Sequence, residues 1–352
     1  MNDFSLYGND LFGEKIVPEK DGILSQKYEF PPFSILDARQ GEWQERKRAW
    51  LAIGITSEIG RGSGVTISDS AGSGSPGDLA TQYKKQQASS AFKNQSRLSA
   101  LQKTGNSRLT WVAGDTPIEE LDEVSRKNLA AQPQSGTSIF DPVLTELAYR
   151  WFCPKGGQIV DPFAGGSVRG IVAGLLGYNY HGIELRKEQV EANKNQHKEI
   201  MPSIKIDWQC GDSIDLLEQS PPSDFIFSCP PYGDLEQYSD DPADLSNMEY
   251  HTFIAAYKRI ILRCYKNLKD NRFACFVVGD FRDKKTGHYR GFVADTINAF
   301  REVGFGFYND AVLVTAVGSL PIRVSAQFEK NRKLGKTHQN VLVFVKGKTP
   351  SF

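Results

Sequence analysis

Beyond Thr137, short apolar runs alternate along the chain with longer segments in which apolar residues recur at helical spacing. Runs of the first kind are typical of buried strands, and segments of the second kind are typical of amphipathic helices. The runs predict strands at 158–161, 179–184, 205–210, 224–228, 272–279, 306–315 and 339–346. The helical segments predict helices at 141–152, 167–177, 187–200, 250–267 and 291–303.

This alternation of strand and helix predicts an α/β fold, with a Rossmann-like, mostly parallel sheet covered by helices on both faces. The last two predicted strands, 306–315 and 339–346, have no long predicted helix between them. One of them is therefore expected to run antiparallel at the edge of the sheet. The pattern fills residues 137–352, which we take as one domain.

The first 56 residues are predicted to form an accessory segment. Within it, helical spacing would place Trp43, Trp50 and Leu51 on one face and turn Arg48 away from it. Two interpretations stay open for this helix. It could dock on the core with a solvated charged side, or its basic residues could contact a nucleic-acid backbone.

Residues 57–136 are predicted to be a flexible linker or loop. From 57 to 107 the chain is rich in Gly, Ser, Gln and Lys, and it offers too little apolar surface to offset the entropy of ordering it. The segment is either a passive linker or a loop that orders when a partner or substrate binds.

Composition bounds the class of protein. With 352 residues, 39% of them hydrophobic and 24% charged, the chain can bury a sizeable core and is expected to be a soluble globular protein. No apolar run approaches the roughly 18 residues of a membrane span, and the N-terminus lacks a secretory pattern. We therefore expect a cytoplasmic protein that has no contact with a membrane. Nothing in the sequence indicates its oligomeric state.

Cysteine usage and net charge limit the metal sites and the nucleic-acid surfaces that the chain can have. The five cysteines are scattered, odd in number and without metal-ligand spacing, which favours reduced thiols and predicts no metal site. The formal net charge is zero, so any surface that binds nucleic acid must be a local basic patch.

A glycine-rich turn follows the predicted strand at 158–161. Ligands of open α/β sheets bind at the carboxyl ends of strands, glycines let a small ligand approach the backbone, and the helix that starts near Ser167 would offer free amides. Such turns occur in many nucleotide-binding folds. The turn is Asp161-Pro162-Phe163-Ala164-Gly165-Gly166-Ser167.

Acidic residues end the next two predicted strands. Glu184 is placed to accept the hydroxyl protons of a ribose, and Asp212 is placed to bond an adenine amino group. Each could instead cap a helix or lie on a solvated surface. Their occurrence at successive strand ends favours the cofactor interpretation.

A stiff turn, Cys229-Pro230-Pro231-Tyr232, closes the apolar run 225–228 and presents an aromatic ring at a strand end. With the glycine-rich turn, Glu184 and Asp212, it resembles, in order, the motifs of S-adenosylmethionine-dependent DNA amino-methyltransferases. Phe140-Asp141-Pro142 looks like the additional cofactor-side motif of that family. The resemblance covers roughly residues 137–348.

The resemblance implies that S-adenosylmethionine is the cofactor and DNA the partner. It implies methyl transfer to adenine N6 or cytosine N4 of a flipped base. Such an amine is a poor nucleophile, because its lone pair is delocalised into the ring. By resemblance, the carbonyl of Pro230 would accept from the amine and Tyr232 would stack on the base, which aligns the nitrogen for transfer.

Cys229 departs from the family pattern, which usually has Asp, Asn or Ser at this position. A neutral thiol is a weak acceptor. Cys229 could be a small residue that leaves the work to backbone carbonyls, a thiolate acceptor, or a covalent nucleophile toward a pyrimidine. It could also mark an inactive site.

A basic cluster between the last two strands is the candidate DNA-binding surface, because each phosphate contact releases counterions. The alternative is a solvated loop. Arg282, Lys284 and Lys285 could extend the same surface. The cluster comprises Arg323, Lys330, Arg332, Lys333 and Lys336.

Two other functions compete with DNA methylation. The same fold and Pro-Pro-Tyr turn could methylate RNA or protein, since other planar amines and amides can occupy such a turn. The unusual Cys229 also allows a catalytically dead module that binds DNA or the cofactor.

Overall fold

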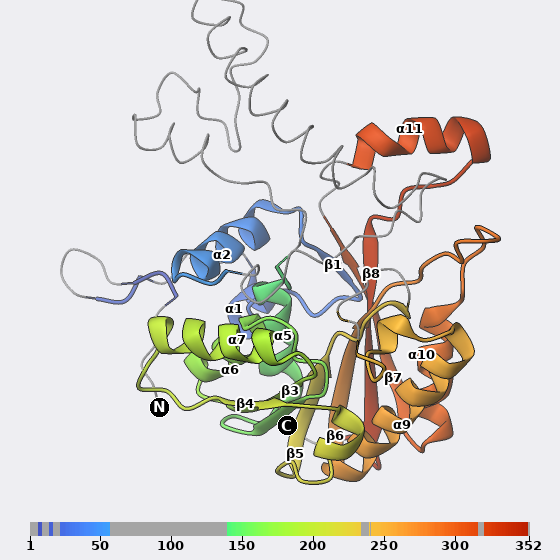
Figure 1. Ribbon diagram of the computed structural model, residues 1–352. Helices are drawn as coiled ribbons and strands as arrows, with labels where there is room; N and C mark the ends of the chain where they lie inside the picture. The colour runs from blue at the N-terminus through green and yellow to red at the C-terminus, as the bar shows by residue number, and fades with distance from the viewer. Residues whose placement is uncertain are drawn as a thin grey trace, which may run out of the picture. The chain divides into compact units, whose positions relative to one another are not determined.

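The computed structural model describes residues 6–8, 14–16, 22–56, 139–233, 239, 241–315 and 320–350. An eight-stranded sheet with the order β1-β7-β8-β6-β5-β2-β3-β4 organises them (Figure 1). Among the described residues, every strand pair is parallel except the two that β8 forms with β6 and β7.

The strands follow one another along the chain with helices between most of them. They are β1 (Ile35–Asp37), β2 (Gln158–Asp161), β3 (Asn179–Glu184), β4 (Asp207–Cys210), β5 (Ser223–Ser228), β6 (Leu268–Val278), β7 (Gly306–Val314) and β8 (His338–Lys346). The described helices are α1 (Ile23–Tyr28), α2 (Gly41–Ala52), α5 (Pro142–Phe152), α6 (Val168–Leu175), α7 (Lys187–Ile200), α8 (Ser213–Leu216), η4 (Leu245–Asn247), α9 (Tyr250–Asn267), α10 (Phe292–Glu302) and α11 (Leu320–Asn331).

The predicted fold class, a Rossmann-like and mostly parallel sheet with helices on both faces, is confirmed. Two details differ from the prediction. The antiparallel strand is β8, and it lies inside the sheet, because β7 and then β1 extend the sheet beyond it. A helix, α11, also connects β7 to β8, where no long helix was predicted.

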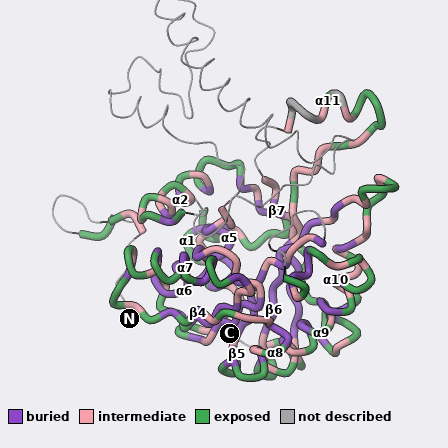
Figure 2. Tube along the Cα trace, in the orientation of Figure 1, coloured by how far each residue is buried: buried purple, intermediate pink, exposed green. Residues whose placement is uncertain are grey.

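The strands separate two hydrophobic cores by the alternation of their side chains. Phe225 and Phe227 of β5 point into the core beneath α2, α5 and α6, whereas Ile226 between them points into the core beneath α9 and α10. The three side chains are fully buried. Figure 2 shows the region of β5 and β6 as mostly buried, whereas the outer sides of α9 and α10 are exposed.

Helix α2 docks on α5, as the first of the two interpretations of its spacing predicts. Trp43 and Trp50 are 1% and 0% exposed, and Arg48 is exposed. Arg46, however, is buried. Its Nε and Nη2 donate to the Glu146 carboxylate over 2.7 and 2.6 Å. A buried ion pair therefore anchors the helix.

The described part of residues 1–56 also supplies β1, which pairs with β7 in the same sheet. The linker predicted for 57–136 lies outside the described residues, and its boundaries stay predictions. In the part of the chain that the structure describes, no helix is both long and apolar enough to cross a membrane.

We expect Arg46→Met to lower the free energy of unfolding by about 3–5 kcal/mol, because it leaves the buried Glu146 carboxylate without its bidentate partner. Urea denaturation followed by circular dichroism measures the change. Lys187→Met is the control, since Lys187 and Glu191 pair on the surface with side chains 80% and 62% exposed; its effect should stay below about 1 kcal/mol. Equal effects of the two substitutions would contradict the anchoring role of Arg46.

Candidate cofactor and catalytic site

The glycine-rich turn and the Pro-Pro-Tyr turn leave the sheet side by side. The chain runs from β2 outward to β3 and β4 and then returns to the other side of β2 as β5, so the strand order reverses between β2 and β5. Ile159 pairs with Phe225 and Val160 with Ile226, which brings the carboxyl ends of the two strands level. Ligands of open α/β sheets bind at such a reversal.

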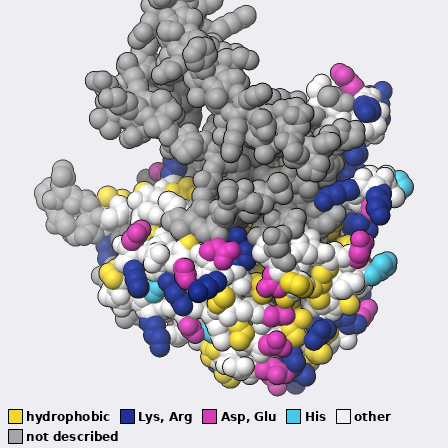
Figure 3. Space-filling model, in the orientation of Figure 1, with side chains coloured by type: hydrophobic (Ala, Val, Ile, Leu, Met, Phe, Trp, Pro, Cys, Tyr) yellow, Lys and Arg dark blue, Asp and Glu magenta, His cyan; other side chains and the backbone are white. Residues whose placement is uncertain are grey.

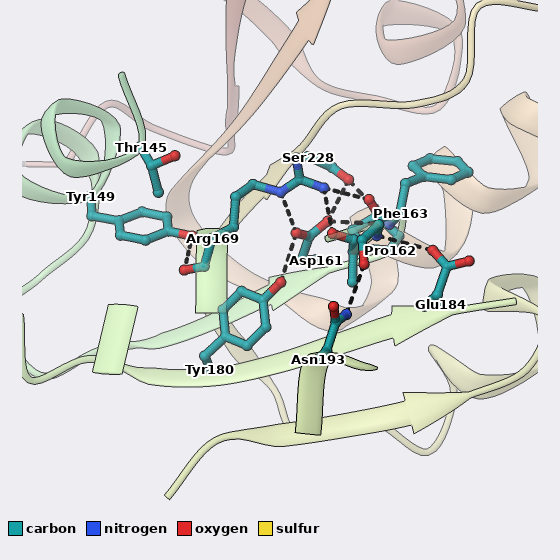
Figure 4. A network of polar contacts seen from close by, with 12 residues as sticks. Thr145, Tyr149, Asp161, Pro162, Phe163, Arg169, Tyr180, Glu184, Asn193 and Ser228 are labelled. Carbon is teal, nitrogen blue, oxygen red and sulfur yellow. Dashed lines mark hydrogen bonds and ion pairs between the residues drawn. The ribbon is translucent and has the colours of Figure 1, made fainter. Parts of the chain in front are cut away.

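Asp161, the last residue of β2, ties the two turns together (Figure 4). Its Oδ1 accepts from Ser228 Oγ at 2.6 Å and from the Phe163 amide at 3.2 Å. Its Oδ2 accepts from Arg169 Nε at 2.6 Å and from the Tyr180 hydroxyl at 2.8 Å. Asp161 is fully buried, so this carboxylate shapes the site through its four donors.

Arg169 extends the network over the glycine-rich turn. It donates to the carbonyls of Phe163 and Ala164, and its guanidinium carbon lies 4.6 Å from the centre of the Phe140 ring. Burial by itself lowers the pKa of Arg169, but the Asp161 carboxylate outweighs burial and holds that pKa above its ordinary value. Phe140 thus packs on the arginine that holds the turn, and its role in cofactor binding stays a prediction.

Two glycines of the turn leave room for a ligand. Gly165 has a φ of +52°, a conformation that L side chains rarely adopt, and a Cβ built on Gly166 meets no atom of the described residues within 4 Å. The Gly165 carbonyl accepts from Asn193 Nδ2 at 2.7 Å, and its amide donates to Glu184 Oε2 at 2.9 Å. This cradle of bare backbone beside a carboxylate fits the sugar of a nucleoside cofactor such as S-adenosylmethionine.

Glu184 lies where the sequence predicts, at the end of β3 and next to the cradle. Its Oε1 accepts from the Arg186 amide at 3.0 Å and lies 3.7 Å from Arg186 Nε. Burial raises the pKa of Glu184, although the Arg186 amide and charge oppose the rise. Each oxygen keeps acceptor capacity for a hydroxyl, because a carboxylate has about four lone-pair sites.

The side chains of Asp212 and Ser167 are committed to local contacts. Asp212 caps α8, because its Oδ1 accepts from the Ile214 amide at 2.8 Å. Ser167 Oγ donates to Gln196 of α7. Ser213, the residue after Asp212, donates to the Pro162 carbonyl and so joins the end of β4 to the glycine-rich turn.

The Pro-Pro-Tyr turn holds its aromatic ring between two strands. The Tyr232 hydroxyl accepts from Gln339 Nε2 of β8 at 2.7 Å, and the Cys229 Sγ lies 3.6 Å from the same hydroxyl. The Tyr232 ring packs edge-on against Phe292, with centroids 6.2 Å apart. Pro230 of the same turn is buried. The Cys229 thiol thus contacts the residue predicted to stack on the base.

The predicted basic cluster divides into exposed and half-buried side chains. Lys330 and Arg332 are exposed, while Lys336 points inward and donates to the Asp280 carbonyl at 3.2 Å. Burial lowers the pKa of Lys336. The Arg323 side chain lies outside the described residues. In Figure 3, Lys and Arg side chains gather at the right, where α11 and the loop after β6 lie in Figure 1.

Several residues of the site were not predicted. Arg169 left a signal, because a single charge inside the apolar segment 168–175 indicates a buried ion pair. Tyr180, Ser228, Asn193 and Gln339 left none, since their partners lie on other strands and helices.

Comparison with known proteins supports the resemblance. The sequence model of a family described as DNA methylase matches residues 223–352, which include β5, the Pro-Pro-Tyr turn and everything up to β8. The glycine-rich turn lies before the matched part. No curated protein sequence is significantly similar to this chain.

Solved methyltransferase structures resemble the fold at low identity. TrmN from Thermus thermophilus is 14% identical with a TM-score of 0.41, and the match covers 59% of this chain and 49% of TrmN, about half its length. A TehB-like SAM-dependent methyltransferase from Corynebacterium glutamicum is 17% identical with a TM-score of 0.38, covering 63% of this chain and 95% of that one. Likeness at this level carries nothing about a substrate.

The match with the DNA methylase family thus covers the C-terminal part of the chain, which lies on the Rossmann-like sheet. The predicted class, an S-adenosylmethionine-dependent methyltransferase, is confirmed at the level of the matched family.

We expect Gly166→Ala to leave the melting temperature nearly unchanged and to weaken S-adenosylmethionine binding by roughly tenfold, about 1.4 kcal/mol. Within the described part of the chain, the added methyl group meets no atom within 4 Å, but it enters the space assigned to the ligand. Differential scanning fluorimetry and isothermal titration calorimetry measure the two quantities. An unchanged affinity would remove Gly166 from the cradle.

The affinity for S-adenosylmethionine should fall as the pH is lowered toward the pKa of Glu184, because protonation leaves Glu184 a poorer acceptor of ribose hydroxyls. Burial raises the pKa of Glu184, so the loss begins at a higher pH than for an ordinary glutamate. Glu184→Gln should bind weakly with little pH dependence, while Glu191→Gln on the surface of α7 should follow the unmodified protein. Calorimetric titration across the pH range measures this, and an unaltered pH profile in Glu184→Gln argues against the role.

Proposed function

We propose that the protein transfers a methyl group from S-adenosylmethionine to an exocyclic amino group of a DNA base, adenine N6 or cytosine N4, that is flipped out of the duplex. The junction of the two turns carries the proposal. The bond from Ser228 to Asp161 fixes the Pro-Pro-Tyr turn against the glycine cradle. The DNA methylase match over residues 223–352 supports the choice of substrate.

Phe140, Gly165, Gly166 and Glu184 are the residues that would hold the cofactor, at the carboxyl ends of β2 and β3. When bound, S-adenosylmethionine supplies a methyl group activated by its sulfonium. The protein's part is then to keep the amine in line with that group and to accept hydrogen bonds from it.

The Pro-Pro-Tyr turn is suited to this task. A Pro230 carbonyl that accepts from the amine polarises it toward the methyl group, and a stacked Tyr232 ring restricts the base to one plane. Gln339 holds the Tyr232 hydroxyl at 2.7 Å, so the ring is oriented before a base arrives. Such preorganisation lowers the barrier to reaction.

Cys229 acts through Tyr232 in this proposal. Its Sγ is 3.6 Å from the Tyr232 hydroxyl, a contact that favours a small positioning residue over a nucleophile. The Pro230 backbone carbonyl then accepts a hydrogen bond from the amine, the amine proton leaves to water after methyl transfer, and no carboxylate is needed at this position.

The test is incubation of the purified protein with labelled S-adenosylmethionine and mixed-sequence duplex DNA, followed by digestion to nucleosides and mass spectrometry. We expect N6-methyladenine or N4-methylcytosine. Cys229→Ala should keep activity within about threefold, and Tyr232→Ala should lose roughly tenfold or more, because base stacking on an aromatic ring contributes about 1–3 kcal/mol.

Other results would overturn parts of the proposal. A methyl group on a ring carbon together with complete loss in Cys229→Ala would make Cys229 a nucleophile. Activity that appears only in Cys229→Asp would indicate a dead module in the natural sequence. Product on RNA or protein and none on DNA would replace the substrate.

A further inference from the structure

The chain between β6 and α10 folds into a short hairpin, residues 281–290. Arg282 and Tyr289 form an antiparallel bridge, the Asp283 amide donates to the His288 carbonyl at 2.8 Å, and the Arg290 amide donates to the Phe281 carbonyl at 2.9 Å. Asp283 Oδ1 caps the turn by accepting from the amides of residues 285 and 286. These bonds fix the shape of the hairpin.

The base of the hairpin is attached to the Pro-Pro-Tyr turn. Phe281 is 5% exposed and packs on Gly233, where a Cβ would lie 2.7 Å from the Phe281 ring. A Cβ on Gly279 would lie 3.7 Å from the Tyr232 ring and 3.8 Å from Lys336 Nζ. The hairpin therefore begins within a few atoms of the residue proposed to stack on the target base.

The hairpin carries an aromatic ring among cations. Tyr289 is 46% exposed, the Arg282 guanidinium carbon lies 3.9 Å from its ring centre, and Lys336 Nζ lies 5.9 Å from it. Lys285 and His288 are also exposed.

The acidic side chain of the hairpin is neutralised. Asp283 is the one acidic residue in positions 281–290 of the sequence, and it pairs with Arg290 at 2.7 Å. Lys333 adds a further cation, since its Nζ would lie 3.6 Å from a Cβ on Gly287. The net charge that this surface presents is therefore positive.

We propose that the hairpin of residues 281–290 binds the nucleic-acid strand next to the flipped base. Tyr289 stacks on an unpaired base, and Arg282 and the exposed Lys285 neutralise the flanking phosphates. Exposed aromatic rings beside basic side chains are the combination that binds unstacked nucleotides. Extruding one base leaves its neighbours with an open face, which the exposed Tyr289 ring can cover. The inference rests on the proposed function for the identity of the strand.

The experiment measures binding without methylation. A fluorescein-labelled duplex with one unpaired base is titrated with each variant over a series of salt concentrations, and fluorescence anisotropy gives Kd. Tyr289→Ala should raise Kd roughly tenfold, and Tyr289→Phe should stay within about twofold because it keeps the ring. Arg282→Gln should reduce the slope of log K against log salt by about 0.9, one phosphate contact.

Matched controls lie at the amino ends of strands β7 and β2, away from the hairpin. Tyr308, near the start of β7, is 45% exposed, and Lys155, just before β2, is also exposed. Tyr308→Ala and Lys155→Ala should bind as the unmodified protein does. Circular dichroism verifies that each variant is folded. If Tyr289→Ala does not fold, the salt dependence of Arg282→Gln still tests the inference.

Equal Kd values for Tyr289→Ala and the unmodified protein at every salt concentration overturn the inference. So does an equal loss of affinity for poly-glutamate, which would indicate a general anion site. The two proposals can fail separately. If the protein methylates DNA but its binding does not depend on Tyr289, only the role of the hairpin is wrong. If binding depends on Tyr289 but no methylated product forms, only the proposed reaction is wrong.

Discussion

The buried carboxylate of Asp161 is the constraint on which the site depends. A buried carboxylate is stable only when hydrogen bonds or opposite charge replace its lost hydration. Here the four donors come from the glycine-rich turn, α6, β3 and β5: the Phe163 amide, Arg169, Tyr180 and Ser228. One charge therefore holds four segments in register, and a shift of any of them leaves the carboxylate partly unsatisfied.

The two turns gain different properties from this arrangement. On the cofactor side, backbone is fixed at Gly165 while no side chain fills the space at Gly166, which leaves a rigid and open cradle. On the substrate side, Tyr232 is held from β8 by Gln339, so the inserted antiparallel strand takes part in the site. The hairpin of residues 281–290 follows β6 at the same end of the sheet, and it presents a basic surface.

Most of the fold followed from the sequence, because strand and helix periodicity are local properties of the chain. Every strand and helix predicted after Thr137 has its counterpart in the structure, and the turns at Asp161 and Cys229 were predicted at strand ends. The place of β8 was not predicted. Strand order is set by contacts between segments far apart in sequence, and no long helix was predicted where α11 connects β7 to β8.

The sequence by itself determined the elements, the two turns and the residue types that resemble a methyltransferase. Only the tertiary structure decided what those residues do. It gave Asp161 four partners, turned Lys336 inward from the predicted DNA-binding cluster, and buried Arg46 against Glu146. The physical reason is the same in each case. The sequence states which groups carry charge and hydrogen-bonding capacity, but their partners lie across strands and helices and come within reach only when the sheet has formed.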